Sequence, residues 1–507
     1  VVSSAEISIH NQGSARNIAV RHSNTVPGGR LGAGVVTDLD GRALPLLVQN
    51  CKNFSGEDEE PFYNPGDPEY NESYFLLPLR EGERLNLQSH HTFQNWGNHP
   101  IKQVGSLQAW MHYHQMSLGV TETTCHVPFR FGGHGGIWIA DLRGISGQMW
   151  PGGGQPQFDN VGGHRFFHYR DAAGEHFPRY VKTRYRSTGP NIADWTMEYA
   201  TDGDEARVII DIVEAPQSDV TRCFTTLRVE FDQPLRIDDA RNRLRLISLD
   251  TTTQRLRYGQ FGYIDEKDEW RSVNPNRNSL PLMASLTEQS PLVVFSDNRP
   301  ESRQQGNNAI LVLGFSGTVE GRSLSRLATG LERRVGAERM IWIAPDADAI
   351  EFRQGDYLQL QFVVIPYGRF GDGPEDALVE RQRYGVHAPT VTTDKGRVLS
   401  QFPARVAVPA VERTDIRLQG GFGALPVSIE GFVDYRPPRV EVKRGNRWDE
   451  VVLGSGNLGH QAYQTPEGAF GFVFLIDVDG SPIECRVTPA LRQHRSRHSA
   501  KSLRTPR

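Results

Sequence analysis

The apolar residues of this chain fall in short runs, without the repeat that marks an amphipathic helix. The clearest runs are rich in β-branched residues and lie at residues 207–215, 224–231, 291–296, 309–315, 339–345 and 357–366. Several alternate apolar and polar residues, and Gly, Pro, Asn and Asp bound them, which is the pattern of β-strands. Only residues 373–385 predict a helix, because Pro and acidic residues open a short amphipathic segment there.

This pattern predicts an all-β protein with large domains of β-sandwich or jelly-roll type, followed by a small immunoglobulin-like sandwich. We expect a polar, His- and Trp-rich domain at residues 1–235 and a second β-sandwich at 236–400. Brief strands separated by turn residues place the immunoglobulin-like sandwich at 401–490. Residues 491–507 contain six Lys or Arg and no acid, which is typical of a disordered basic tail.

Charge and length narrow the function classes. The 507 residues carry a formal net charge of −4, which argues against a nucleic-acid partner. The chain has no run of about 18 apolar residues, so we expect no membrane span. Because it starts at "VVSSAEISIH" without a methionine, we expect a processed protein that is secreted or periplasmic. Cys51, Cys125, Cys223 and Cys485 lie far apart, which excludes a zinc ribbon and leaves their pairing open.

Histidine and tryptophan are concentrated in one part of the first domain. Ten of the 16 histidines lie between His90 and His176, and five of the eight tryptophans lie between Trp96 and Trp195. These residues stand among glycines, which let the backbone approach a ligand closely. We therefore expect residues 90–186 to build a ligand-binding groove. The alternative is an aromatic-rich domain with polar strands and no site.

The aromatic residues suit a sugar ligand, because sugar rings stack on flat apolar faces and sugar hydroxyls bind amides and carboxylates. Trp195 is better explained by core packing. The residues predicted to bind a polysaccharide or oligosaccharide substrate are Trp96, Trp110, Tyr113, Arg130, His134, Trp138, Trp150, His164 and Arg170.

A metal site is an alternative use of the same histidines. His112 and His114 are two residues apart, so on a strand they would share a face and could bind one divalent metal. His134, His164 or His168 could then supply a third ligand. Cupin barrels have a similar H-x-H pair, but they place a glutamate four or five residues later. Here Glu122 follows His114 by eight residues, so we expect that no cofactor is required.

Residues 161–171, "VGGHRFFHYRD", combine imidazole, guanidinium and phenol groups. Strict strand alternation would place His164, Phe166, His168 and Arg170 on one face, and Tyr169 on the other. Cleavage of an acidic polysaccharide by β-elimination needs a cation to neutralise the uronate, a base and an acid. His114, His126, His168 and Tyr169 are the candidate catalytic residues for this reaction.

Hydrolysis is the competing chemistry, since it needs two carboxyl groups across the scissile bond. Glu122 lies among β-branched residues, and Asp141 is its candidate partner. The sequence lacks a nucleophile elbow, a P-loop, a dinucleotide fingerprint and an H-E-x-x-H motif, which argues against the corresponding enzymes.

A polar β-domain followed by smaller sandwiches is broadly similar to the organisation of carbohydrate-active enzymes. We therefore predict a secreted enzyme that cleaves glycosidic bonds in a polysaccharide, by β-elimination on an acidic, uronate-containing glycan. A glycoside hydrolase, a non-catalytic glycan-binding or assembly protein, and a His-ligated metalloenzyme are the alternatives. The sequence leaves the sugar, the linkage and the oligomeric state open.

Overall fold

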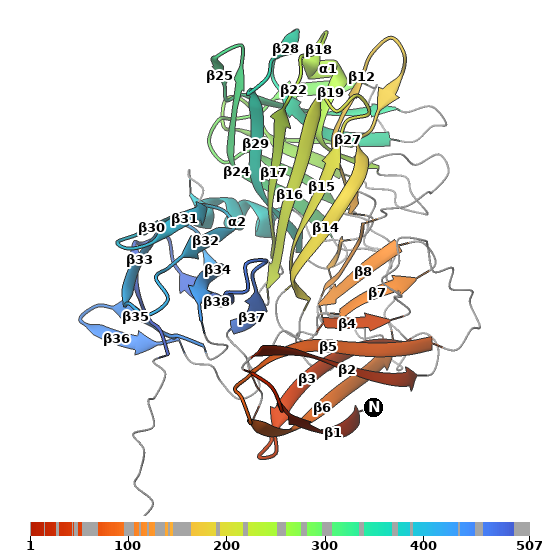
Figure 1. Cartoon of the computed structure of the whole chain (residues 1–507). Helices are drawn as coiled ribbons and strands as arrows, with labels where there is room; N and C mark the ends of the chain where they lie inside the picture. The colour runs from red at the N-terminus through yellow and green to blue at the C-terminus, as the bar shows by residue number, and fades with distance from the viewer. Residues whose placement is uncertain are drawn as a thin grey trace, which may run out of the picture.

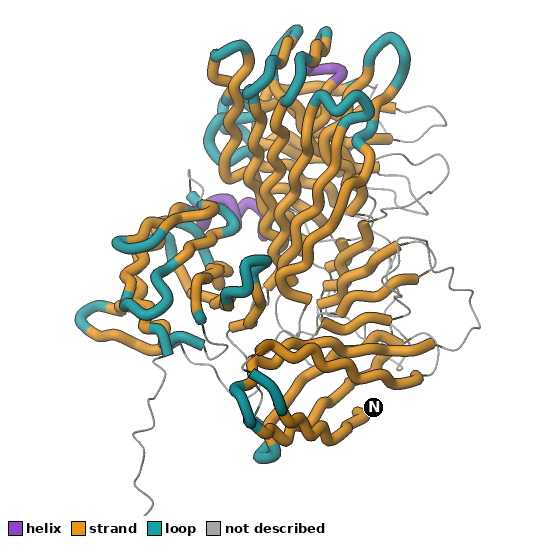
Figure 2. The backbone as a smooth tube through the Cα atoms, viewed as in Figure 1, coloured by secondary structure: helices purple, strands orange, loops and turns teal. Residues whose placement is uncertain are grey.

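The computed structural model of the chain describes residues 2–14, 16–26, 30–42, 44, 49–52, 69–95, 106–110, 113–118, 121–126, 137–139, 142–144, 164–188, 193–215, 222–250, 260–274, 281–296, 307–333, 339–367, 374–385, 389–433, 437–451 and 460–490. These residues form 39 strands and two helices, so the protein is mostly β, as predicted. All six apolar runs form strands (Figures 1 and 2). The predicted helix is also confirmed: α2 (Glu375–Tyr384) ends at Gly385, whose φ of 69° favours glycine.

Two sheets form the N-terminal part of the molecule (Figure 1). One sheet has the order β1 (Val2–His10), β6 (Arg84–Asn95) and β3 (Arg30–Asp38). The other has the order β11 (Leu142–Gly144), β9 (Thr121–His126), β8 (Tyr113–Leu118), β7 (Ser106–Trp110), β4 (Gln49–Lys52), β5 (Glu69–Leu79) and β2 (Arg16–Val26). A small apolar cluster containing Val36, Phe75 and Leu87 joins residues of both sheets.

Two larger sheets form the middle of the molecule, and we call them sheet C and sheet D. Sheet C has the order β10 (Ile137–Ile139), β12 (His164–Arg170), β19 (Leu244–Asp250), β27 (Arg339–Pro345), β26 (Leu327–Arg333) and β22 (Leu282–Ser285), and β13 (Glu175–His176) pairs with β12. Sheet D has the order β14 (Arg179–Thr188), β15 (Ala193–Ala200), β16 (Ala206–Ala215), β17 (Arg222–Phe231), β29 (Tyr357–Tyr367), β24 (Asn307–Val319), β23 (Leu292–Ser296), β20 (Gln260–Ile264) and β21 (Trp270–Val273), and β25 (Arg322–Leu324) pairs with β24. A two-stranded sheet of β18 (Leu235–Ile237) and β28 (Ile350–Phe352), with the short helix α1 (Ala240–Arg243), lies at one end.

Sheets C and D share one large core. Alternate residues of β16, including Val208, Ile210 and Ile212, enter the same cluster as Phe166 and Ile343 of sheet C. Apolar residues are buried there because removing their surface from water is favourable. The Phe166 and Phe362 rings lie 6.1 Å apart between their centroids and connect the two sheets directly.

Two five-stranded sheets form the C-terminal unit, residues 389–490. The first has the order β30 (Thr390–Thr393), β33 (Thr414–Gln419), β39 (Ile483–Thr488), β35 (Arg439–Arg444) and β36 (Arg447–Glu450). The second has the order β31 (Arg397–Ser400), β32 (Ala404–Ala407), β34 (Gly423–Phe432), β38 (Phe470–Val478) and β37 (His460–Gln464). Their buried residues share a cluster with the second face of sheet D, so both faces of sheet D are covered along part of its length.

Sheet D joins strands from both sides of the predicted domain boundary at residue 235. Strands β14 to β17 precede that residue, yet β17 pairs with β29, which lies far beyond it. Distant strands join one sheet because their backbone groups need partners, whatever their separation in sequence. The C-terminal unit begins at β30, shortly before the predicted start at residue 401. No helix in the part of the chain that the structure describes is long and apolar enough to cross a membrane.

Candidate functional site

Strand β12 does not alternate as the sequence pattern predicts. Phe167 has a φ of 42°, in the left-handed region that residues with large side chains rarely adopt. Phe166, Phe167 and Tyr169 all enter the core between sheets C and D. The predicted alternation of residues 161–171 is therefore wrong, because one unusual backbone conformation changes the direction of the side chains that follow.

Arg165 and His168 both contact the ring of Phe177. The imidazole of His168 stacks on this ring at 5.0 Å between centroids, and the guanidinium of Arg165 lies 5.4 Å from its centre. His168 also forms a buried hydrogen bond of 2.8 Å between its Nε2 and the Ser248 Oγ. Only 2% of His168 is exposed, so its ring is held in a fixed position.

Strand pairing extends this arrangement across sheet C. Arg165 lies opposite Ser248, Ser248 lies opposite Trp342, and Trp342 lies opposite Gly330. Directly opposite residues of antiparallel strands share a face of the sheet. We call the group of Arg165, His168, Arg245, Ser248 and Trp342, all of which are buried, the Arg165–Trp342 face.

Arg245 is the most constrained residue of this face. Its guanidinium lies 4.0 Å from the centre of the Trp342 ring and 3.1 Å from Glu332 Oε2. It also donates to the carbonyl oxygens of Arg241, Asn242 and Leu244, which satisfies the end of α1. Burial lowers the pKa of Arg245, and the attraction of Glu332 opposes that effect.

Two donors on this face are buried without a hydrogen-bond partner in the part of the chain that the structure describes. Among the described residues, neither Nε of Arg245 nor Nε1 of Trp342 has a hydrogen-bond partner. Buried donors are normally paired, because an unpaired one costs about 1–3 kcal/mol. The guanidinium and imidazole groups of this face would favour an anionic ligand over a neutral one.

Tyr169 lies in the core and stacks on His176, with 4.8 Å between the ring centroids. Burial, followed by the charges of Glu205, Asp171 and Asp202, raises the pKa of Tyr169 to about 12. Arg170 is largely exposed and pairs with Glu175 at 3.1 Å. Hence the described residues do not bring His168 and Tyr169 together as an acid–base pair.

Several other predicted site residues are placed by strand pairing alone. His114 of β8 lies directly opposite His126 of β9, so the structure brings these two candidates together. Glu122 lies opposite Ser117 and, on its other side, Arg143. The remaining pairs are Trp110 with Tyr113, Trp138 with Arg165, and His164 with both Ile139 and Leu249.

The other predicted site residues lie outside the described part of the chain: Trp96, His112, Arg130, His134, Asp141 and Trp150. The described residues contain no group of three His, Cys, Asp or Glu side chains that could hold a metal ion. Cys223 and Cys485 are buried, and burial raises the pKa of the Cys485 thiol to about 12.

The sequence analysis missed Arg245, Ser248, Trp342 and Phe177. A signal for two of them exists, because Arg245 and Ser248 interrupt the apolar run "LRLISL" of β19. A second charged group with the same signal lies between sheet D and the C-terminal unit. There Asp211 interrupts the run "RVIIDIV" of β16.

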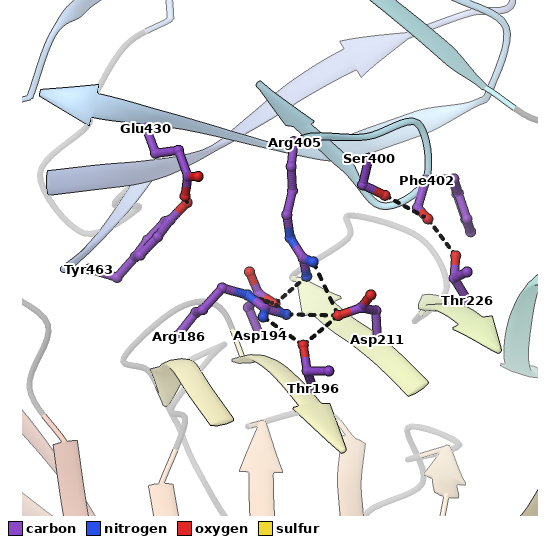
Figure 3. A network of polar contacts seen from close by, with 10 residues as sticks. All are labelled: Arg186, Asp194, Thr196, Asp211, Thr226, Ser400, Phe402, Arg405, Glu430 and Tyr463. Carbon is purple, nitrogen blue, oxygen red and sulfur yellow. Dashed lines mark hydrogen bonds and ion pairs between the residues drawn. The ribbon is translucent and has the colours of Figure 1, made fainter. Parts of the chain in front are cut away.

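This second group consists of two aspartates and two arginines (Figure 3). Arg186 of β14 lies 2.6 Å from Asp194 and 3.2 Å from Asp211. Arg405 of β32 approaches from the C-terminal unit, at 3.0 Å from Asp194 and 3.1 Å from Asp211. Thr196 donates a hydrogen bond to Asp211. We call Arg186, Asp194, Asp211 and Arg405 the junction cluster.

Comparisons with known proteins give a distant structural similarity and nothing at the level of sequence. No family model and no curated protein matches the sequence. The structure is similar to the GH36 alpha-galactosidase AgaB from Geobacillus stearothermophilus, with a TM-score of 0.33 and 11% identity over 51% of this chain and 40% of AgaB. AgaA from the same organism gives a TM-score of 0.33 and 10% identity, over 57% of this chain and 43% of AgaA.

The alpha-galactosidase from Lactobacillus brevis gives a TM-score of 0.31 and 11% identity, over 54% of this chain and 40% of the enzyme. The chain thus covers less than half the length of each of these three proteins. It is a β-rich protein with distant structural similarity to glycoside hydrolases. At these scores the similarity identifies neither a shared active site nor an activity.

Proposed function

We propose that the protein is a carbohydrate-active enzyme that acts on an acidic, uronate-containing polysaccharide at the Arg165–Trp342 face. The observation that carries this proposal is the gathering of two guanidiniums, an imidazole, a hydroxyl and an indole on one face of sheet C. These groups are suited to bind a carboxylate and an adjoining sugar ring. Strand β10, with Trp138 opposite Arg165, connects this face to the His- and Trp-rich segment.

The cationic groups of the face support an anionic ligand. Arg165 and Arg245 belong to the face, and Arg170 adjoins it through Glu332, which lies 4.0 Å from Arg170 and 3.1 Å from Arg245. In the proposed β-elimination, Arg165 would neutralise the uronate carboxylate and His168 would take the C5 proton. The bond from C4 to the leaving oxygen would break as the C4–C5 double bond forms, and the imidazolium would return the proton to that oxygen. We give Tyr169 no part in this step, because its ring lies in the core.

A non-catalytic glycan-binding protein is the second candidate. The burial of Tyr169 in the core favours it, because it removes the phenol that the sequence suggested as a catalytic group. We further propose that sheets C and D form a β-sandwich, and that the C-terminal unit is a smaller, immunoglobulin-like one. The shared core of sheets C and D supports the first of these assignments.

The test is a panel of acidic and neutral polysaccharides, followed by reducing ends, ultraviolet absorbance of unsaturated uronate, and binding. We expect both cleavage signals to rise on an acidic glycan. Reducing ends alone would indicate hydrolysis and direct attention to Glu122 and Asp141. Binding without cleavage would select the second candidate, and the absence of both binding and cleavage on every acidic glycan would refute the proposal.

Variants connect the activity to the face. Arg165→Gln and His168→Gln should each lower kcat/KM by roughly 10- to 100-fold, because each removes a charge-assisted hydrogen bond. Arg207→Gln is the matched control, since its exposed guanidinium pairs with Glu230 at 2.7 Å on another sheet. Equal activity in all three variants would exclude this face from the reaction.

A further inference from the structure

The C-terminal unit meets sheet D through an interface that is mostly apolar. Phe224 of β17 and Phe402 of the C-terminal unit are both buried, and their rings lie 5.7 Å apart, edge to face. Thr226 donates a hydrogen bond to the Phe402 carbonyl oxygen beside them (Figure 3). Apolar contacts favour burial without fixing a direction, so most of this surface does not specify one orientation of the unit.

The charged residues of the junction cluster specify the orientation of the C-terminal unit. A β-bulge between Tyr185 and Ser187 makes Arg186 the extra residue of β14. Bulges re-aim side chains, and here the guanidinium reaches across β15 to Asp211 on β16. Asp194 is fully buried, so its negative charge has to be balanced by neighbouring groups.

The charges of the cluster do not balance without the C-terminal unit. On sheet D, Asp194 and Asp211 carry two negative charges and Arg186 carries one positive charge, which leaves −1. Arg405 brings the sum to zero through contacts of 3.0 and 3.1 Å. Figure 3 shows its guanidinium entering from the opposite side to Arg186.

We propose that Arg405 fixes the position of the C-terminal unit through its charge, because it balances the negative charges of Asp194 and Asp211. β14 of sheet D contacts β37 of this unit and also β4 of the N-terminal part. A change in the position of the unit would therefore act on a strand that touches the N-terminal part as well. The proposal is independent of the glycan-binding role of the Arg165–Trp342 face.

The ion pairs of Arg405 should determine how the stability of the protein depends on pH. Burial alone would raise the pKa of Asp211, but Arg405, Arg186 and the Thr196 hydroxyl together hold it below its usual value. Its contribution is therefore fully present above about pH 4 and lost as the pH falls through the lowered pKa.

Replacing Arg405 should reverse the direction of this pH dependence. In Arg405→Met, burial opposes a charge that no longer has its partner, so one carboxyl group of the cluster should acquire a raised pKa. Its contribution would then be present at low pH and lost as the pH rises toward 7. Glu430 and Tyr463 are the other titratable groups beside the cluster in the described residues, and Tyr463 donates to Glu430 at 2.9 Å. Burial raises the pKa of Tyr463, so it stays neutral in this range.

The experiment measures the Tm of the full chain between pH 4.5 and 7.5. Arg405→Met should lose roughly 5 °C at pH 7.5 and recover part of that loss at pH 4.5. The charge-balanced double variant Arg405→Met/Asp211→Asn should regain most of the loss at pH 7.5. Glu430→Gln is the control for the remaining acid and should leave the contrast between Arg405→Met and the wild type unchanged.

The same loss at every pH, with no recovery in the double variant, would mean that Arg405 acts through packing alone and would overturn the proposal. If Arg405→Met does not fold, the double variant and Arg405→Lys decide the matter. A folded double variant with nearly the wild-type Tm supports the proposal. An Arg405→Lys variant with a small loss of Tm that is independent of pH also supports it. A double variant that also fails to fold contradicts it.

Discussion

The ion pair between Arg222 and Glu380 should be among the most sensitive positions for stability. Arg222 lies on β17, and Glu380 lies on α2, which leads from sheet D to the C-terminal unit. Their contact is bidentate, with Nε to Oε2 at 2.9 Å and Nη2 to Oε1 at 2.8 Å. The exposed fractions of the two side chains are 0% and 3%, so neither charge has water to replace its partner.

Removal of one partner leaves a buried charge unbalanced, at a cost of about 3–5 kcal/mol. We expect that loss of unfolding free energy in Arg222→Met. Among the residues that the structure describes, Glu380 then keeps its 3.3 Å contact with Arg383 and no other ion pair. The double variant Arg222→Met/Glu380→Met removes both charges and should lie within about 2 kcal/mol of the wild type. Arg207→Met is the control, because the exposed Arg207–Glu230 pair should contribute less than about 1 kcal/mol.

The assay is equilibrium unfolding in urea, followed by circular dichroism and by tryptophan fluorescence. Coincident transitions with unchanged slopes allow the midpoints to be compared as free energies. A positive coupling in the double-mutant cycle, with the double variant more stable than either single variant, is the expected result. Losses that simply add, or an Arg222→Met variant no worse than Arg207→Met, would refute the reasoning.

Two other predictions concern sheet C. Gly330 lies under the Trp342 ring, and a β-carbon there would overlap both the indole and the Leu282 carbonyl oxygen, so Gly330→Ala should cost about 1–3 kcal/mol in urea unfolding. Gly13→Ala, where the added carbon has room, should be neutral, and equal effects would contradict this account. Because the pKa of Tyr169 is raised to about 12, its neutral form contributes stability that is present below about pH 10 and is lost as the pH rises through 12. Tyr169→Phe should therefore flatten the alkaline fall in Tm, and an unchanged alkaline profile would count against burial of that phenol.

The strands were predictable from the sequence because β-branched runs and turn residues are local signals. The apolar run 207–215 forms β16, and residues 373–385 contain α2. The pairing of β17 with β29 was not predictable in this way, since it joins residues more than 100 positions apart. Periodicity carries no information on which distant strands become neighbours.

The candidate site was only partly predictable, for a different reason. His168 was predicted as a catalytic residue, and its polar partner in the structure, Ser248, is 80 residues away in the sequence. Tyr169 was placed on the face opposite to Phe166 because strict alternation was assumed. The left-handed conformation of Phe167 breaks that alternation, and both side chains enter the core. Such a conformation is rare for phenylalanine, so no sequence pattern would have indicated it.

The buried charged residues that the structure describes make different kinds of contact. Arg222 pairs with Glu380 where α2 meets sheet D, and Arg405 pairs with Asp194 where the C-terminal unit meets it, so assembly of the molecule accounts for both. Arg245 secures the end of α1. Arg165 and His168 instead lie together over one phenylalanine ring, away from these junctions. Assembly does not account for these two polar side chains, whose described contacts are with Phe177 and Ser248. Substitutions at Arg165 and His168 should therefore separate function from stability better than those at the other buried charges.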